Sequence, residues 1–399
     1  MEHIDGKGCL RLVSRIVFLV EATFNKRDFH RFGIETLQSN GFGVQVWDLT
    51  KVLNPGYAAN HRVPDPYTFD GLRVLETNDD IRKAIVRLER NDVVVALLGF
   101  SSKYFFIYRS LSRRGIKYGV NSLVPLPGVA PKRNYLKFAT KGFSSPGKLL
   151  GAVANRLPVS LLGIKPPSFI LIAGTAANGS NYPIGKSTDV VNCHTPDYDR
   201  YLQMDKTLEA RVGQHGVFLD EYLPFHPEFL IGDLKAPAPP ETYYHKLNDF
   251  FGLVERETGC EVVIAAHPRS KYEDHPDYFD GRTVSRGSTP ELIKDAKFVL
   301  AHCSTSIGFA VLFEKPVFFL TTNEIEKSYL SDHIAMMAKW FGKRPLNLDE
   351  YGELDIDREM TVDATAYNLY RQTFIKKHGT PEIPLWQIFA NYLRNSSAA

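Results

Sequence analysis

Cysteine is scarce in this 399-residue sequence, and the four that occur form no metal-binding pattern. They stand at positions 9, 193, 260 and 303 without a CxxC pair, which argues against the common zinc motifs. We therefore expect reduced thiols in a cytoplasmic protein. Long apolar runs are absent as well. The run at residues 16–20 is too short for the core of a signal peptide or for a membrane span, and we predict a first strand there.

The sequence also lacks the short motifs of several large enzyme classes. No GxGxxG follows the first predicted strand, which argues against a dinucleotide site there. A Walker A loop, a GxSxG nucleophile elbow and an HExxH metal site are missing too, and no bound metal is expected. Low-complexity segments and internal repeats are absent. A composition of 44% hydrophobic and 23% charged residues fits a globular chain of two or three domains.

Negative charge is missing from one long stretch of the chain. Between Asp92 and Asp189 there is no Asp or Glu, while Lys and Arg recur throughout. Residues 1–165 carry 25 Lys and Arg against 13 Asp and Glu, a net charge of +12, and the remainder carries 23 against 32, a net charge of −9. Such a basic half attracts anionic partners, whether lipid head groups, phosphorylated glycans or nucleic acid. A solvated basic surface without a partner is the alternative.

Predicted strands and helices alternate along the chain. Strands are expected at residues 15–21, 43–49, 72–75, 93–98 and 117–120, and a single helix at 27–39 follows the first of them. Repeated βα units predict a parallel, Rossmann-like sheet. A second series of units begins near residue 216. We expect an α/β fold with domains at 1–205 and 206–375, and a C-terminal helix within 376–399 that crosses back to the first domain.

Two predicted strands in the second half end in residues suited to anions. These residues are His267, Pro268 and Arg269 after the strand at 262–266, and Ser304, Thr305 and Ser306 after the strand at 298–301. A histidine fixed by proline at a strand end is a good phosphate ligand. Hydroxyls and backbone N–H groups at a helix start bind anions as well. A strand-capping histidine and simple N-capping are the alternatives for each motif alone. Together they predict a ligand crevice at one edge of the sheet.

Carboxylates follow the short strand at residues 216–219. Asp220 and Glu221 are candidates for a general base, because a carboxylate beside an apolar aromatic loop can have a raised pKa. A loop carboxylate in a salt bridge or helix cap is the alternative. Weaker candidates for sugar or acceptor contacts are Asn178, in a Gly-rich turn, and His194. Residues 197–199 form a DxD pattern, which residues 355–357 match equally well, so it carries little information.

The motifs resemble those of a known group of enzymes. Two Rossmann-like halves with the ligand crevice in the second resemble the GT-B glycosyltransferases. The HP pair and the Ser/Thr-rich turn resemble bacterial sialyltransferases, polysialyltransferases and Kdo-type transferases, which use CMP-activated sugar acids. Their third signature, two acids followed by glycine, is matched in part by Asp220 and Glu221, with Tyr222 in place of the glycine. The motifs cover roughly residues 216–320, and the first half is similar in architecture alone.

The resemblance implies a role for each motif. His267 would hold the CMP phosphate, while Ser304 and Thr305 would bind the phosphate or the sugar carboxylate. Asp220 or Glu221 would deprotonate the acceptor. UDP-sugar enzymes of this fold often carry a ribose-binding glutamate one turn into the helix after the phosphate loop. Residues 308–313 contain no acid, which argues against a UDP-sugar donor and against the related 2-epimerases.

The predicted function is an inverting, metal-independent glycosyltransferase. It would move a sialic-acid-like or Kdo-like sugar from a CMP-activated donor, without a cofactor, to a glycan or glycolipid hydroxyl in lipopolysaccharide or capsule biosynthesis. Residues 1–205 would bind the acceptor and residues 206–375 the nucleotide sugar. We expect a cytoplasmic protein whose basic N-terminal half contacts the anionic inner membrane peripherally, without a nucleic-acid partner. CDP-glycerol or CDP-ribitol phosphotransferases, other nucleotide-sugar transferases and a non-catalytic basic glycan- or nucleic-acid-binding protein are the alternatives.

Overall fold

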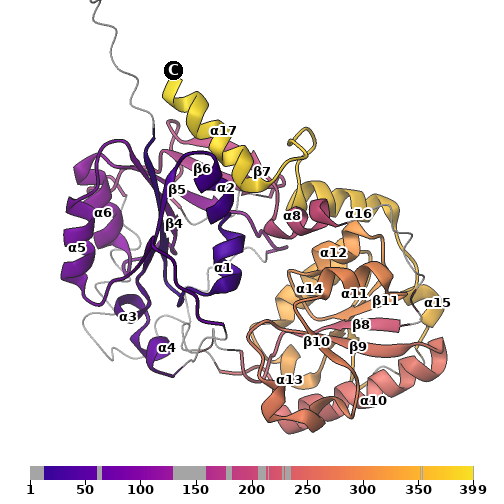
Figure 1. Cartoon of the computed structure of the whole chain (residues 1–399). Coiled ribbons are helices and arrows are strands. Elements are labelled where there is room, and N and C mark those ends of the chain that lie inside the picture. The colour runs from indigo at the N-terminus through magenta and orange to yellow at the C-terminus, as the bar shows by residue number, and fades with distance from the viewer. Residues whose placement is uncertain are drawn as a thin grey trace, which may run out of the picture.

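The protein consists of two lobes, each built on a parallel sheet between helices (Figure 1). The computed structural model describes residues 13–60, 65–128, 159–176, 182–204, 213, 215–226, 229, 235–350, 352 and 354–398. The predicted α/β fold with two Rossmann-like domains is confirmed. The predicted domain boundary at 205/206 lies in residues 205–212, outside the described residues.

The first sheet has seven parallel strands in the order β3-β2-β1-β4-β5-β6-β7. Its strands are β1 (Arg15–Val20), β2 (Gly43–Asp48), β3 (Leu72–Val74), β4 (Asp92–Leu97), β5 (Lys117–Ser122), β6 (Phe169–Ala173) and β7 (Asp189–Cys193). In β1, Phe18 lies between Val46 of β2 and Val95 of β4. Side chains of successive residues point to opposite faces, so the apolar run of β1 is buried on both sides of the sheet.

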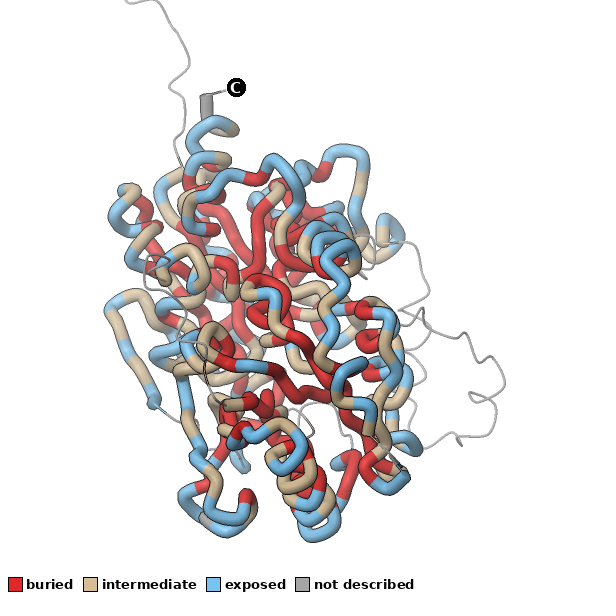
Figure 2. Tube along the Cα trace, turned by 90° about the vertical axis from the view of Figure 1, so that its right-hand side faces the viewer, coloured by how far each residue is buried: buried red, intermediate tan, exposed pale blue. Residues whose placement is uncertain are grey.

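Helices cover both faces of this sheet. They are α1 (Lys26–Arg31), α2 (Ile34–Ser39), α3 (Thr50–Leu53), α4 (Pro55–Asn60), α5 (Asn78–Val86) and α6 (Phe105–Arg114). One face packs against α5 and α6, and the other against α1, α2 and the C-terminal helix α17 (Leu385–Ala398). The strands at the centre are the most buried part of the chain, as Figure 2 shows.

The second sheet has six parallel strands in the order β10-β9-β8-β11-β12-β13. Its strands are β8 (His215–Leu219), β9 (Glu261–Ala266), β10 (Val284–Arg286), β11 (Phe298–Ala301), β12 (Val317–Thr321) and β13 (Leu346–Asn347). Its helices are α10 (Pro240–Thr258), η2 (Tyr272–Asp274), η3 (Pro276–Phe279), α11 (Thr289–Asp295), α12 (Ile307–Leu312), α13 (Asn323–Glu326), α14 (Ser331–Trp340), α15 (Ile356–Glu359), α16 (Ala364–Tyr370) and the π-helical turn η4 (Arg371–Ile375). The long helix α10 covers one face, and α11, α12 and α16 cover the other.

The chain crosses between the lobes twice. Helix α8 (Pro196–Gln203) follows the last strand of the first sheet, and its Tyr198 packs in the core of the second lobe. The return passes through η4, where His194 and Lys376 form an isolated antiparallel bridge. Helix α17 then lies on the first lobe (Figure 1). Within the described part of the chain, no helix combines the length and apolar character that crossing a membrane requires.

One predicted element differs from the observed structure. The single helix expected at residues 27–39 is two helices, α1 and α2, which meet at Gly33. Gly33 has a φ of +55°, in the left-handed region that glycine favours. A Cβ at this position would also lie 2.2 Å from Cδ1 of Trp386. The helix therefore ends at this glycine, whose missing side chain leaves room for Trp386 of α17.

Candidate active site

The predicted site lies where the strand order of the second sheet reverses. Strands β8 and β11 are neighbours, yet the connections leaving them run to opposite sides, as at the ligand-binding crevices of doubly wound sheets. Asp220 follows β8, His267 follows the adjacent β9, and Ser304 comes shortly after β11. A cleft of about 880 Å³ opens at these strand ends and extends to α1 of the first lobe.

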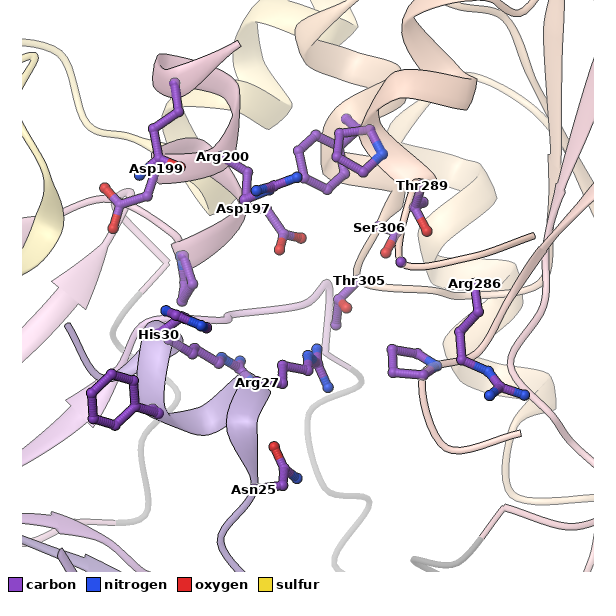
Figure 3. A pocket seen from close by; sticks show the side chains of 18 of the residues that line it. Asn25, Arg27, His30, Asp197, Asp199, Arg200, Arg286, Thr289, Thr305 and Ser306 are labelled. Atoms are coloured by element: carbon purple, nitrogen blue, oxygen red, sulfur yellow. The ribbon is translucent and has the colours of Figure 1, made fainter. Parts of the chain in front are cut away.

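Most of the predicted residues line this one cleft. They are Asp220, His267, Pro268, Arg269, Ser304, Thr305 and Ser306. The first lobe contributes Asn25, Arg27, His30 and Arg31, the crossing helix α8 contributes Asp197, Asp199 and Arg200, the end of β10 contributes Arg286, and the start of α11 contributes Thr289. Figure 3 shows Arg27 on one wall and Thr305 and Ser306 on another, with the side chain of Asp197 between them. The cleft therefore has hydroxyls, carboxylates and several cations facing one space.

His267 is held as a neutral hydrogen-bond donor. The backbone N–H of Arg269 donates to Nδ1 of His267 at 3.2 Å, which leaves the ring proton on Nε2. Burial, with smaller contributions from the nearby charges of His226 and Arg269, lowers the pKa of His267 to about 2. The ring of His226 lies edge-on at 4.7 Å between centroids. His267 therefore offers an uncharged N–H to a ligand over the whole physiological pH range.

The Ser/Thr turn combines a fixed and an open hydroxyl. The Oγ of Ser304 accepts the backbone N–H of Ser306 at 3.2 Å, which shapes the turn. Thr305 is exposed and lines the cleft. Helix α12 has only six residues, so its dipole is a smaller contribution than the sequence predicted. The hydroxyls and the backbone N–H groups of the turn are the main donors here.

Asp220 and Glu221 each form a hydrogen bond to one of two loops, the HP loop that begins at His267 and the loop that leads into the Ser/Thr turn. The carboxylate of Asp220 accepts the backbone N–H of His267 at 3.1 Å and that of Tyr222 at 2.8 Å. Glu221 accepts the backbone N–H of Cys303 at 2.8 Å. The paired acids thus tie the HP loop and the Ser/Thr turn to the end of β8, although the two loops are far apart in sequence. Only Asp220 lines the cleft.

Both acids are difficult to ionise. Burial raises the pKa of Asp220 to about 6, against the effect of its two backbone N–H partners, which lower it. Burial raises the pKa of Glu221 to about 7, against the effect of the Cys303 backbone N–H and thiol. A carboxylate with a pKa near neutrality is suited to accept a proton during a reaction. Asp220 therefore has both the position and the proton affinity of a general base.

Tyr222 has the backbone conformation of a glycine. Its φ is +52°, in the left-handed region that side chains other than glycine rarely adopt. The ring compensates by packing against Phe225 and Tyr272, with centroids 5.4 and 5.3 Å away. The tyrosine that replaces the expected glycine therefore keeps the turn that this position requires.

The two weaker predictions do not join the cleft. His194 is fully buried and does not line it. Its ring nitrogens lie 3.1 Å from the carbonyl oxygen of Thr195 and 2.9 Å from that of Ile383, which fixes the crossing between lobes. Asn178 lies outside the described residues. Neither residue is placed at the site by the structure.

Sequence reasoning missed the wall contributed by the first lobe. Arg27 and Arg31 are four residues apart on α1, a spacing that puts both on one helix face and that was visible in the sequence. Asp197 and Asp199, set aside as an uninformative pattern, both line the cleft. Of the acid-free stretch, the described residues 93–128, 159–176 and 182–188 do not line the cleft.

The charged side chains of the cleft are not arranged as a metal site. Among the residues that the structure describes, no group of three or more His, Cys, Asp or Glu side chains converges closely enough to hold a metal ion. Asp199 is instead engaged with the backbone, since its Oδ1 accepts the N–H of Leu385 at 2.8 Å.

Comparison with known proteins supports the fold. No protein-family model matches this sequence, and no curated protein is similar to it. Among solved structures, the glycosyltransferase of kitacinnamycin is 13% identical, with a TM-score of 0.50 over 96% of this chain and 98% of that one. A UDP-N-acetylglucosamine 2-epimerase (12% identity, 97% of each chain) and CalG4, the calicheamicin glycosyltransferase (11% identity, 90% and 92%), each have a TM-score of 0.47.

The chain has the two-domain fold of the GT-B type. The likeness to the kitacinnamycin glycosyltransferase extends over nearly the whole length of both chains, so it includes both lobes and their order. At 13% identity it concerns the fold alone, and a shared fold does not by itself define a reaction. The chemistry of the cleft therefore carries any statement about activity.

Proposed function

We propose that this protein transfers a sugar acid from a CMP-activated donor to a hydroxyl group of a glycan. The observation that carries the proposal is the convergence of three motifs on one cleft. The HP loop, the Ser/Thr turn and the paired acids are all joined at the end of β8 by the hydrogen bonds of Asp220 and Glu221. The left-handed conformation of Tyr222 supports the match of the third motif.

The donor would bind through its phosphate. The Nε2–H of His267 and the hydroxyls of Thr305 and Ser306 face the cleft and supply uncharged donors to a phosphate oxygen. Arg269, on the same loop as His267, supplies positive charge to the phosphate, so the proposal includes no metal ion. When the bond between the sugar and the phosphate breaks, CMP leaves with the electron pair, and these groups stabilise its added negative charge.

Asp220 is the proposed base. The acceptor hydroxyl forms a new bond to the anomeric carbon on the side opposite to CMP, which inverts the configuration. Its proton passes to the Asp220 carboxylate, whose pKa of about 6 leaves most of it ionised at pH 7. Glu221 is the positioning residue beside it, because its carboxylate holds Cys303 and does not line the cleft.

The rival enzymes differ in the donor that they bind. A CDP-glycerol or CDP-ribitol phosphotransferase would release CMP from a diphosphate donor and bind CDP-alcohols. A UDP-sugar transferase would bind UDP. A non-catalytic basic glycan- or nucleic-acid-binding protein would bind none of these nucleotides. Peripheral contact with an anionic membrane through the basic N-terminal half is a further part of the proposal, and it concerns a surface outside the cleft.

A nucleotide screen tests the proposal. Thermal unfolding is measured with CMP, CDP, UMP and UDP, followed by turnover with CMP-N-acetylneuraminic acid. A ligand at 100 times its Kd adds about 2.7 kcal/mol to stability, which a melting curve detects as a shift of a few degrees. We expect CMP to stabilise most. If UDP or CDP stabilises the protein most, the donor is not a CMP-activated sugar. If no nucleotide raises the melting temperature, the non-catalytic protein is favoured.

A further inference from the structure

Four of the five arginines that line the cleft fall into two groups. Arg200 pairs with Glu291 at 3.1 Å and Arg286 pairs with Glu273 at 2.7 Å, so their charges are already balanced. Arg27 and Arg31 line the same cleft, and neither forms an ion pair with any residue in the part of the chain that the structure describes. Their charges are therefore available to a ligand.

The fold holds both side chains toward the cleft. Asn25 caps α1 by accepting the backbone N–H of Asp28 at 3.0 Å. Phe29 is buried against Tyr67 and Phe69, with ring centroids 4.9 and 5.4 Å away. Residues two before and two after Phe29 lie on the opposite side of a helix with 3.6 residues per turn. Burial of Phe29 therefore turns Arg27 and Arg31 away from the core and into the cleft.

Positive charge is concentrated around this pair. Loss of water lowers the pKa of Arg27 although the side chain keeps solvent contact, and the charges of Arg31 and, more weakly, Arg269 lower it further. The acids among them are Asp28 and Asp197, and burial raises the pKa of both. Among the groups that act on the charge of Arg27, the cations Arg31 and Arg269 therefore oppose two acids that resist ionisation. An anion bound between them would remove this repulsion.

We propose that Arg27 and Arg31 bind a second anionic group of the substrates, a carboxylate or a phosphate, in the cleft that the turn at 304–306 also lines. Figure 3 shows Arg27 on the wall facing Thr305 and Ser306. The inference rests on the proposed transfer reaction and deepens it. Two substrates can supply such a group: the donor, through the carboxylate of its sugar acid, and the acceptor, through an acidic residue of the glycan. Arginine is suited to either because its guanidinium matches a carboxylate or phosphate with two parallel hydrogen bonds.

Binding to variants distinguishes the two sources. We compare the wild-type protein with Arg27→Gln, Arg31→Gln and the double variant, using calorimetry with CMP and with CMP-N-acetylneuraminic acid. Arg113→Gln, on α6 outside the cleft, is the matched control for loss of one charge. We expect CMP affinity to stay within twofold in every variant. A loss of at least tenfold in donor affinity in the double variant assigns the pair to the donor carboxylate.

Steady-state kinetics tests the second possible source of the anion, the acceptor. If donor affinity is unchanged, KM for a sialylated oligosaccharide should rise at least tenfold in the double variant while KM for lactose stays constant. That result assigns the pair to an acidic acceptor. Wild-type donor affinity together with wild-type KM for the sialylated acceptor would overturn the inference.

A probe without a nucleotide separates this inference from the transfer reaction. Inorganic pyrophosphate should bind the wild-type protein and Arg113→Gln equally, and should bind the double variant at least tenfold more weakly. If no nucleotide binds but pyrophosphate shows this dependence, the CMP-donor proposal fails and the anion site stands. Equal pyrophosphate affinity in all variants, together with unchanged donor affinity and unchanged KM for the sialylated acceptor, would overturn the anion site.

Discussion

The indole Nε1 of Trp386 donates a hydrogen bond to the backbone carbonyl of Arg31 at 2.7 Å. The two residues are 355 positions apart, so the last helix of the chain fixes the end of the first. Trp386 is 4% exposed and also lines the cleft. Because Arg31 is half of the proposed anion site, the C-terminal helix positions part of the site that it borders.

Replacing Trp386 by Phe should destabilise the protein by about 1 to 3 kcal/mol, since the Arg31 carbonyl loses its donor and part of the ring volume is left empty. Urea unfolding measures the change. Tyr392→Phe on the same helix is the control, because the bond to Asp189 that it removes is exposed, and the substitution should change stability by less than about 0.5 kcal/mol. Equal effects of the two substitutions would show that the indole bond is unimportant.

Gly33→Ala should destabilise the protein more than Trp386→Phe or Tyr392→Phe. A side chain at this position would be strained at a φ of +55° and would lie 2.2 Å from Trp386. Together the strain and the overpacking cost about 2 to 5 kcal/mol. Gly41→Ala, at a φ of +87° with no atom near its Cβ, isolates the backbone part of this cost. A melting temperature of Gly33→Ala equal to that of Gly41→Ala would contradict the packing of α17 against this turn.

Glu221→Gln should change how stability depends on pH. The pKa of Glu221 in the folded protein is about 7, above its ordinary value of 4.5, so its contribution is complete below pH 4.5 and is lost as pH rises through 7. Glutamine keeps an oxygen for the Cys303 N–H and does not ionise. Relative to wild type, the variant should therefore gain about 2 to 3 kcal/mol between pH 4.5 and 8.

The comparison is made by urea unfolding at several pH values. Asp220, whose pKa is also raised, is present in both proteins and affects both curves alike. Parallel stability curves for wild type and Glu221→Gln between pH 4.5 and 8 would show that Glu221 ionises normally in the fold.

His267→Ala should weaken CMP binding by at least tenfold, because a hydrogen bond to a charged phosphate contributes about 1.5 to 3 kcal/mol. The folded pKa of about 2 lies below the ordinary 6.5, so the stability linked to the neutral ring is present above pH 6.5 and is lost as pH falls. The variant should therefore be less sensitive to acid. His245→Ala on α10, an exposed residue outside the cleft, is the control for calorimetry and unfolding. Unchanged CMP affinity would remove His267 from the phosphate site.

Local sequence was sufficient for much of the second lobe. The buried apolar runs before His267 and before Ser304 predicted β9 and β11, and parallel strands place their carboxyl ends at the same edge of a sheet. Polar residues that follow such runs therefore meet in space. The same reasoning named Asp220 and Glu221, because they follow the neighbouring strand β8.

The sequence by itself determined the α/β architecture and the loops of the second sheet, because both follow from the period of apolar residues and from what comes after each strand. Only the tertiary structure decided which residues face those loops. Arg27, Arg31 and Asp197 reach the cleft because α1 and α8 are held against it by contacts with α17 and with the second lobe. The tertiary structure also showed that the Asp220 and Glu221 carboxylates accept hydrogen bonds from backbone groups far away in the sequence. Such contacts depend on burial and on packing between residues far apart in the chain, which spacing along a single sequence does not record.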